Sequence, residues 1–359
     1  MSQRNAPLQP GTRRRASETL GYTPPVRARR LSPAVNRRLV GALCFIGWVA
    51  GLLAASTAFV DLGLGEPPWT ARAGAAGLAV VYSLALTYRC GGRVRVWPVL
   101  VLLGGAATLA TELSWLLSTV SVVTAVLASV LAVMLTRPAA TIPRVIGELA
   151  VTVVVALSGT VAVAAWDAPV LYVRFNLAVL ALAMAVTFGV VWGLGAGLHG
   201  MGRRGLLLVA GSAIAMAVIL AYGTAVREYG SPMVVDNIDA AVQWLDENVG
   251  GVPRPAVFLV GLPALVWGIS TRVERRQGWW MCAFAVVGPA VMTTSLASPM
   301  VSLSYVGLST LYSVLLGLAL GLLLRRFDPG TPSRAGRRAR RDVSAVAVRP
   351  EPSRFSRLT

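Results

Sequence analysis

Long apolar stretches alternate with short polar connections along the chain, and this pattern predicts membrane-spanning helices. Most stretches approach the ~20 residues that a helix needs to cross a hydrocarbon core ~30 Å thick. They are continuous rather than alternating, which favours helices over a closed barrel as the way to satisfy every backbone group in lipid. We expect about ten spans, at residues 39–60, 73–88, 96–111, 116–135, 145–166, 171–196, 205–226, 255–271, 279–297 and 302–324.

The third and fourth spans form one apolar block, residues 96–135, interrupted only around Glu112. As a single helix this block would be ~60 Å long, about twice the thickness of the membrane core. We therefore predict a tight hairpin near Glu112, with a short third helix.

Composition supports a membrane protein. Of the 359 residues, 55% are hydrophobic and 13% are charged, whereas soluble domains carry about 25% charged residues. This balance excludes an ordinary soluble enzyme and a disordered chain. Every basic residue is an arginine, which is typical of a high-GC genome, as in actinobacteria.

The charges are distributed unequally between the two sides of the predicted bundle. With the N-terminus placed inside, the inner connections carry ten arginines and one acid, and the outer connections carry four arginines and nine acids. Basic connections stay in the cytoplasm during membrane insertion. We therefore predict an all-α polytopic bundle in the plasma membrane with both termini cytoplasmic.

Two arginine-rich arms flank the transmembrane domain, which we place at residues 39–324. Residues 1–38 hold nine arginines and one acid, and residues 325–359 have a similar composition without apolar periodicity, so both are expected to be disordered. Next to a membrane, each arginine contributes roughly 1 kcal/mol of attraction to anionic lipid headgroups. The expected partners are therefore lipids rather than nucleic acid.

The long outer loop at residues 227–254 contains a helical pattern. Asp236 can cap a short helix, and Gly250 and Gly251 end it. Four apolar side chains then share one face: Ile238, Val242, Leu245 and Val249. We expect an amphipathic helix on the outer rim, or alternatively a lid or docking element with an acidic face.

Three polar residues near the outer side are candidates for a substrate pathway. Glu112, Arg174 and Asn176 share a similar predicted depth, and charges left in lipid are costly. One hypothesis is that Glu112 faces Arg174, with Asn176 completing a polar cluster; the alternative is that each charge reaches the outer water separately. On the inner side, Arg144 and Glu148 have the i,i+4 spacing of a helical ion pair.

Small residues predict close helix packing. Gly193 and Gly197 end the sixth span within a glycine-rich run that superficially matches nucleotide-binding loops, but no strand precedes it. Ser313, Gly317 and Gly321 repeat at four-residue spacing in the last span. Such stripes let two backbones approach, within the bundle or between protomers of a homo-oligomer.

Enzyme signatures are missing from the sequence. It contains no G-x-S-x-G or H-E-x-x-H motif, and His199 is its single histidine, at the predicted inner interface. We therefore expect no catalytic residues, no metal site and no cofactor. An intramembrane enzyme would need a water-filled chamber around His199 or the acids of the outer loop.

Ten helices with both ends inside resemble the plan of several carrier superfamilies, including the drug/metabolite transporters built as five plus five helices. The resemblance is one of helix count, and it implies a permease or flippase-like carrier for a small or lipid-linked solute. The alternative is a scaffold or assembly factor in an envelope-building or division complex, bound to another membrane protein. A polar cavity would favour the carrier, and a solid interior would favour the scaffold.

Overall fold

The structure is a computed structural model of the whole chain. It divides into two units, residues 1–40 and 41–359. The residues that it describes are 33–60, 67, 69–194, 232–273, 278–297, 301–326, 351–354 and 356–358.

The described residues form helices and no strands. Six of the helices are long and apolar enough to cross a membrane, so the described part of the chain is compatible with a membrane helix bundle. The predicted span at 205–226 lies outside the described residues, and the number of spans and the side of the termini stay predictions. The helices are α1 (Pro33–Ser56), α2 (Thr70–Arg89), α3 (Trp97–Thr111), α4 (Ser114–Met134), α5 (Ile142–Ala165), α6 (Tyr172–Gly193), α8 (Pro232–Val249), η2 (Ala256–Gly261), α9 (Leu262–Thr271), α10 (Gly278–Ala285), α11 (Val287–Thr293) and α12 (Leu303–Arg326).

The apolar block at 96–135 is divided where the sequence predicts a hairpin. Glu112 adopts a left-handed backbone conformation, with φ of 50°. Its N–H donates to the Thr108 carbonyl, which ends α3 in the manner of a helix C-cap. The chain then turns and α4 begins at Ser114.

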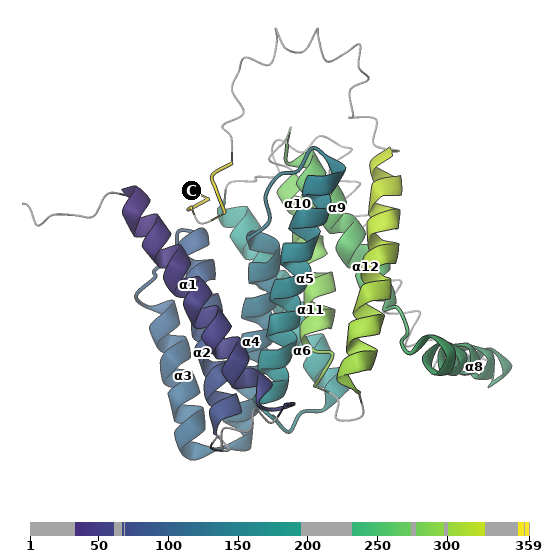
Figure 1. Cartoon of the computed structure of the whole chain (residues 1–359), viewed down its shortest axis with the longest axis horizontal. Coiled ribbons are helices and arrows are strands. Elements are labelled where there is room, and N and C mark those ends of the chain that lie inside the picture. The colour runs from purple at the N-terminus through teal and green to yellow at the C-terminus, as the bar shows by residue number, and fades with distance from the viewer. Residues whose placement is uncertain are drawn as a thin grey trace, which may run out of the picture. The chain divides into compact units, whose positions relative to one another are not determined.

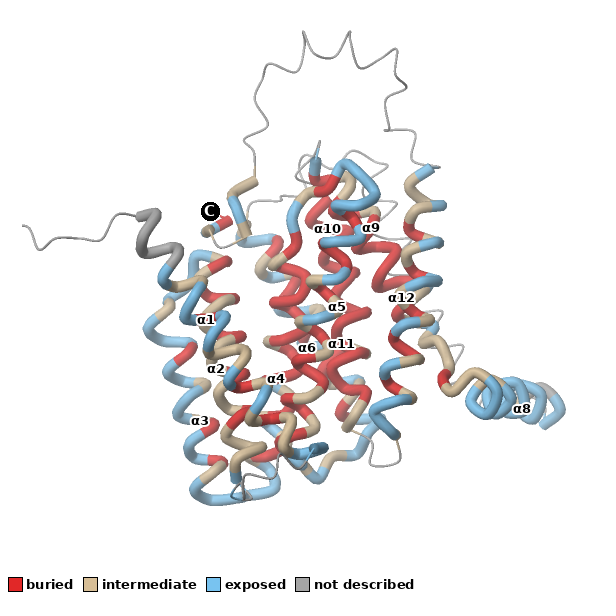
Figure 2. Tube along the Cα trace, viewed as in Figure 1, coloured by how far each residue is buried: buried red, intermediate tan, exposed pale blue. Residues whose placement is uncertain are grey.

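In the core of residues 41–359, α4, α5 and α11 pack against one another, and α9 and α10 are also largely buried (Figures 1 and 2). Val130, Leu149 and Val287 are among its fully or almost fully buried side chains. The faces of α3, α6 and α12 instead expose large apolar side chains such as Leu103 and Leu177. Apolar surface of this extent is what a protein surrounded by lipid tails presents.

The segment around the last predicted spans contains two interrupted helices. A π-helix, η2, leads into α9, which has Pro263 near its start. Likewise α10 ends at Ala285, and α11 starts two residues later and contains Pro289. Because proline removes a backbone N–H and clashes with the preceding turn, it breaks or bends helices, and π-helical turns are often found at functional sites.

The interrupted helices contact each other through glycines. A Cβ atom placed on Gly261 would overlap the backbone of Gly288, and one on Gly278 would lie 2.6 Å from the Gly268 carbonyl oxygen. Neither position has room for a side chain. The helix pair η2–α9 and α10–α11 is therefore packed backbone against backbone at two levels.

The predicted small-residue stripe on α12 packs against the same interrupted helix. A Cβ on Gly317 would lie 2.7 Å from Leu262 Cβ, and a Cβ on Gly321 would lie 2.7 Å from Val266 Cβ. Ser313 accepts a hydrogen bond from the Arg254 backbone N–H. Gly317 and Gly321 therefore pack closely against η2–α9 within the chain, and packing between protomers stays a prediction.

Gly193, the other described packing candidate, makes no such contact with the described residues. Among the described residues, no neighbouring helix comes within 4 Å of the position that a Cβ on Gly193 would take. Gly197 lies outside the described residues.

Candidate functional site

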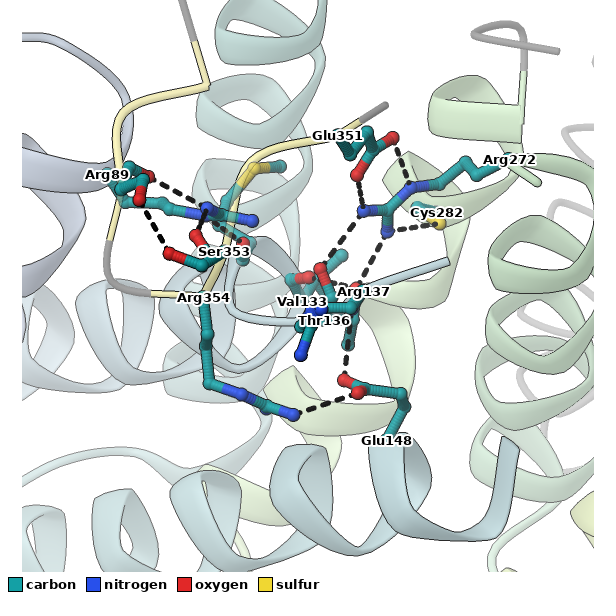
Figure 3. A network of polar contacts seen from close by, with 12 residues as sticks. Arg89, Val133, Thr136, Arg137, Glu148, Arg272, Cys282, Glu351, Ser353 and Arg354 are labelled. Carbon is teal, nitrogen blue, oxygen red and sulfur yellow. Dashed lines mark hydrogen bonds and ion pairs between the residues drawn. The ribbon is translucent and has the colours of Figure 1, made fainter. Parts of the chain in front are cut away.

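One end of the bundle is formed by three helix connections, at residues 89–96, 135–141 and 272–273, and we call it the arginine end. The Ala139 N–H donates to the Ile269 carbonyl, which ties the second connection to α9. The sequence predicts that all three connections face the cytoplasm. Residues 351–354 and 356–358, here called the C-terminal segment, lie against this end (Figure 3).

Arg272 is a fully enclosed charge at the arginine end. Its side chain has no exposed area, and its guanidinium binds both Glu351 oxygens, with Nη2 2.5 Å from Oε2 and Nε 3.1 Å from Oε1. It also donates to the hydroxyl and the carbonyl oxygen of Thr136 and lies 3.6 Å from the centre of the Trp279 ring. A two-pronged arginine–carboxylate pair of this kind is among the strongest polar contacts in proteins.

The charge of Arg272 is maintained despite its burial. Burial lowers the pKa of its guanidinium, but Cys282 and the bound Glu351 carboxylate raise it, and the net shift is upward. The side chain therefore stays a cation.

Among the described residues, Arg89 at the end of α2 is bound only by carbonyl oxygens. Its Nε donates to Met134, and its Nη1 donates to Ser353 at 2.7 Å and to Ser356 at 2.8 Å. The Arg89 side chain is buried, yet its Nη2 has no hydrogen-bond partner among the described residues. The Leu358 N–H donates to the Arg89 carbonyl, and the Leu358 side chain is buried beside it.

Glu148 makes the third contact with the C-terminal segment. Its carboxylate accepts hydrogen bonds from the Arg137 backbone N–H at 2.9 Å and from Arg354 Nη2 at 2.8 Å. The sequence predicts an ion pair with Arg144, but within the described part of the chain Glu148 pairs with Arg354. Arg354 is distant in sequence, so spacing along one helix could not reveal it.

The C-terminal segment thus joins Arg89, Glu148 and Arg272, which are far apart in the sequence. The sequence predicts a disordered tail over residues 325–359, whereas the structure shows the residues of this segment in contact with the bundle. The physical reason is charge and shape together: Glu351 meets a buried arginine, and Leu358 finds an apolar position. Sequence periodicity carries no signal for a peptide this short.

The opposite end of the bundle holds the predicted outer candidates. Glu112 forms an ion pair with Arg72 on the first turn of α2, at 3.0 Å, and Asp167 lies 3.7 Å from the same guanidinium. Both acids are largely exposed, so each contact contributes at most about 1 kcal/mol. The structure therefore pairs Glu112 with Arg72 rather than with Arg174.

The remaining two candidates of that group are not joined to Glu112 by any ion pair or hydrogen bond of the described residues. Arg174 is exposed, and Asn176 is half-buried with its Oδ1 atom unpartnered within the described regions. Whether Glu112, Arg174 and Asn176 line a pathway stays a prediction. Arg72 is the partner that sequence reasoning missed, although it is one of the four outer arginines.

Buried hydroxyls form a second polar group, around the end of α11. Ser129 and Thr293 share a hydrogen bond of 3.0 Å, and Thr160 donates to the Met292 carbonyl at 2.7 Å. Ser129, Thr160 and Thr293, here called the hydroxyl cluster, come from α4, α5 and α11 and are buried. They supply polar groups inside the bundle, beside one of the interrupted helices.

Within the described ranges, no group of three or more His, Cys, Asp or Glu side chains is arranged to hold a metal ion. No protein family model, curated protein or solved structure matches the chain. The interrupted helices, the hydroxyl cluster and the arginine end are therefore the features from which function is inferred.

Proposed function

We propose that this chain is a non-enzymatic carrier, a permease or flippase-like protein of the plasma membrane, for a small or lipid-linked solute. It would cross the membrane ten times with both termini in the cytoplasm. The observation that carries the proposal is the pair of interrupted helices, η2–α9 and α10–α11, in backbone contact at Gly261 and Gly288. Discontinuous membrane helices are a common means by which carriers form binding sites and move.

Two further features support this proposal. The hydroxyl cluster places polar groups beside α11, where a solute could exchange hydrogen bonds with the protein. The arginine end concentrates positive charge where a carrier would receive or release an anion. A carrier built on these elements would open alternately at its two ends by moving the interrupted pair against α4 and α5.

Distances between spin labels test this alternation. Labels at Arg93 and Val273 report on the arginine end, and labels at Trp115 and Leu303 report on the opposite end; all four side chains are exposed. In lipid nanodiscs we expect two distance populations at each end, because each end would be open in one state and closed in the other.

A pair within one helix provides the control. Labels at Ile146 and Val154, both exposed on α5, should give one distance in every condition. A single narrow distance at both ends of the bundle would contradict the carrier and favour a scaffold.

The scaffold alternative has one observation in its favour. Helix α8 lies apart from the other described helices and begins one turn before the predicted cap, Asp236 (Figure 1). It exposes Ile238 and Val242 on its apolar face and Asp239 and Glu247 elsewhere. Such a helix fits either the outer surface of the membrane or a partner protein.

Spin-label accessibility distinguishes these two roles of α8. If α8 lies on the membrane, a label at Val242 should contact oxygen dissolved in lipid, and a label at Gln243, about 100° around the helix, should contact a water-soluble nickel reagent. Equal access of the nickel reagent to both positions in nanodiscs would show that α8 stands clear of lipid and is free for a partner.

The arginine-rich arms fit the same membrane setting. Residues 1–38 and the part of the tail before the C-terminal segment are proposed to bind anionic lipid headgroups, at roughly 1 kcal/mol per arginine near the surface. No nucleic-acid partner is proposed.

A further inference from the structure

The charges at the arginine end do not balance. The polar contacts of the C-terminal segment involve three guanidinium groups, those of Arg89, Arg272 and Arg354, but the described residues supply only two carboxylates in ion-pair contact with them, Glu148 and Glu351. Arg272 and Arg354 take one carboxylate each. Arg89 is left as a buried cation that faces carbonyl oxygens. Burial disfavours its charge, and repulsion from the positive charge of Arg272 disfavours it further.

A buried guanidinium in this state is a strong site for an anion. Its Nη2 points to no acceptor in the described regions, although the side chain is 1% exposed. A buried charged donor that lacks an acceptor destabilises the folded protein. An anion that accepts this hydrogen bond removes the destabilisation. The paired N–H groups of an arginine guanidinium match the spacing of the oxygens in phosphate and carboxylate groups.

Oxygen atoms of the C-terminal segment already occupy part of the position that an anion would take. Glu351 presents two carboxylate oxygens to Arg272, and the Ser353 and Ser356 carbonyl oxygens cover Nη1 of Arg89 (Figure 3). Glu351 retains 14% exposure, and the C-terminal segment is held mainly by polar contacts rather than by a buried helix face. An external anion could therefore displace it by offering the same arginines better oxygens.

We infer that Arg89 and Arg272 form a binding site for a phosphate group, and that Glu351 of the C-terminal segment occupies this site as an internal competitor. The phosphate belongs either to a soluble ligand or to a lipid headgroup, since the arginine end lies where the chain leaves the apolar helices. Binding of the phosphate releases the C-terminal segment. The release exposes the end of the bundle that this segment covers. This inference goes beyond the proposed carrier and does not depend on it, because it concerns binding and tail release rather than movement across the membrane.

A spin label on the C-terminal segment measures the release. Ser353 is exposed and can be changed to cysteine for labelling. The native cysteines compete poorly for the label, because Cys44 and Cys282 are buried and burial raises the pKa of Cys90 to about 11. The full-length protein is placed in phosphatidylcholine nanodiscs, and inorganic pyrophosphate is added at constant ionic strength with chloride.

We expect pyrophosphate to mobilise the label in a saturable manner. Glu351→Gln should loosen the segment without ligand, and in direct titration it should lower the dissociation constant for pyrophosphate by roughly tenfold or more, because it weakens a charge-assisted contact that competes with the ligand. In the Glu351→Gln background, Arg89→Gln should raise that constant by roughly tenfold or more, and Arg89→Lys should recover part of the affinity. Asp246→Asn, an exposed acid on α8, is the matched control and should have no effect.

A second set of nanodiscs, containing phosphatidic acid without pyrophosphate, identifies the source of the phosphate. Mobilisation by the lipid alone assigns the site to a headgroup, and mobilisation by pyrophosphate alone assigns it to a soluble ligand.

Direct titration of pyrophosphate into the unlabelled Glu351→Gln protein covers the case in which the label itself disturbs the segment. An unchanged elution volume in size-exclusion chromatography shows that this variant is folded. The inference is overturned if neither probe mobilises the label or binds the Glu351→Gln protein, or if Arg89→Gln leaves the affinity unchanged.

Discussion

Replacing Arg272 with glutamine is expected to free the C-terminal segment from the bundle and to destabilise the protein. The guanidinium of Arg272 binds Glu351 and Thr136, and its side chain is fully enclosed. Breaking a buried ion pair costs about 3–5 kcal/mol, and because Glu351 is partly exposed and can turn to water, we expect about 2–3 kcal/mol here. A nitroxide at Ser353 should become mobile, and the unfolding temperature in detergent should fall.

Arg357→Gln is the matched control for this change. Arg357 belongs to the same segment but is exposed, with its guanidinium 5.8 Å from the centre of the Tyr88 ring. A contact of this kind contributes about 0.5–1 kcal/mol at an exposed site. If the label stayed immobile in Arg272→Gln, or moved equally in both variants, the ion pair with Glu351 would not be what holds the segment.

Replacing Gly261 with alanine is expected to have the second large effect, because the new methyl group would overlap the Gly288 backbone. A backbone cannot move aside as a flexible side chain can, so η2–α9 and α10–α11 would have to separate. Overpacking of this kind typically costs about 1–3 kcal/mol, and we expect the upper part of that range. The loss should appear as a lower unfolding temperature and as a changed distance between labels at Arg93 and Val273.

Gly307→Ala separates this effect from the general consequences of adding a methyl group to a helix. Gly307 is on α12, and among the described residues no neighbouring helix comes within 4 Å of the position that its Cβ would take. Alanine there should leave stability unchanged or raise it slightly, because alanine favours helices by about 1 kcal/mol over glycine. Equal stability of the two variants would mean that the helix pair is not closely packed at Gly261.

Apolar run length and charge were sufficient to predict the class of the protein and the break at Glu112. Trp69, Trp97, Trp115 and Trp192 are exposed near helix ends, whereas Trp166 is fully buried and donates to Thr124. Position along a span indicates how deep a residue lies, but only packing decides which neighbour it meets.

The contacts of the candidate site were beyond prediction for the same reason. Glu112 pairs with Arg72 and Glu148 pairs with Arg354, and in each case the partner comes from a distant part of the chain. The break between α10 and α11 also left little trace, because both sides of it are apolar. Pro289 was its one local signal.

The C-terminal segment also imposes an order on biogenesis. Arg89 and Arg272 are synthesised before Glu351, so α2 and α9 form while these two cations still lack the segment that later covers them. The arginines can meanwhile remain in water or contact headgroups, which would hold α2 and α9 at the correct depth during insertion. Closure of this end is then a late, post-insertional step of maturation, performed by the chain itself.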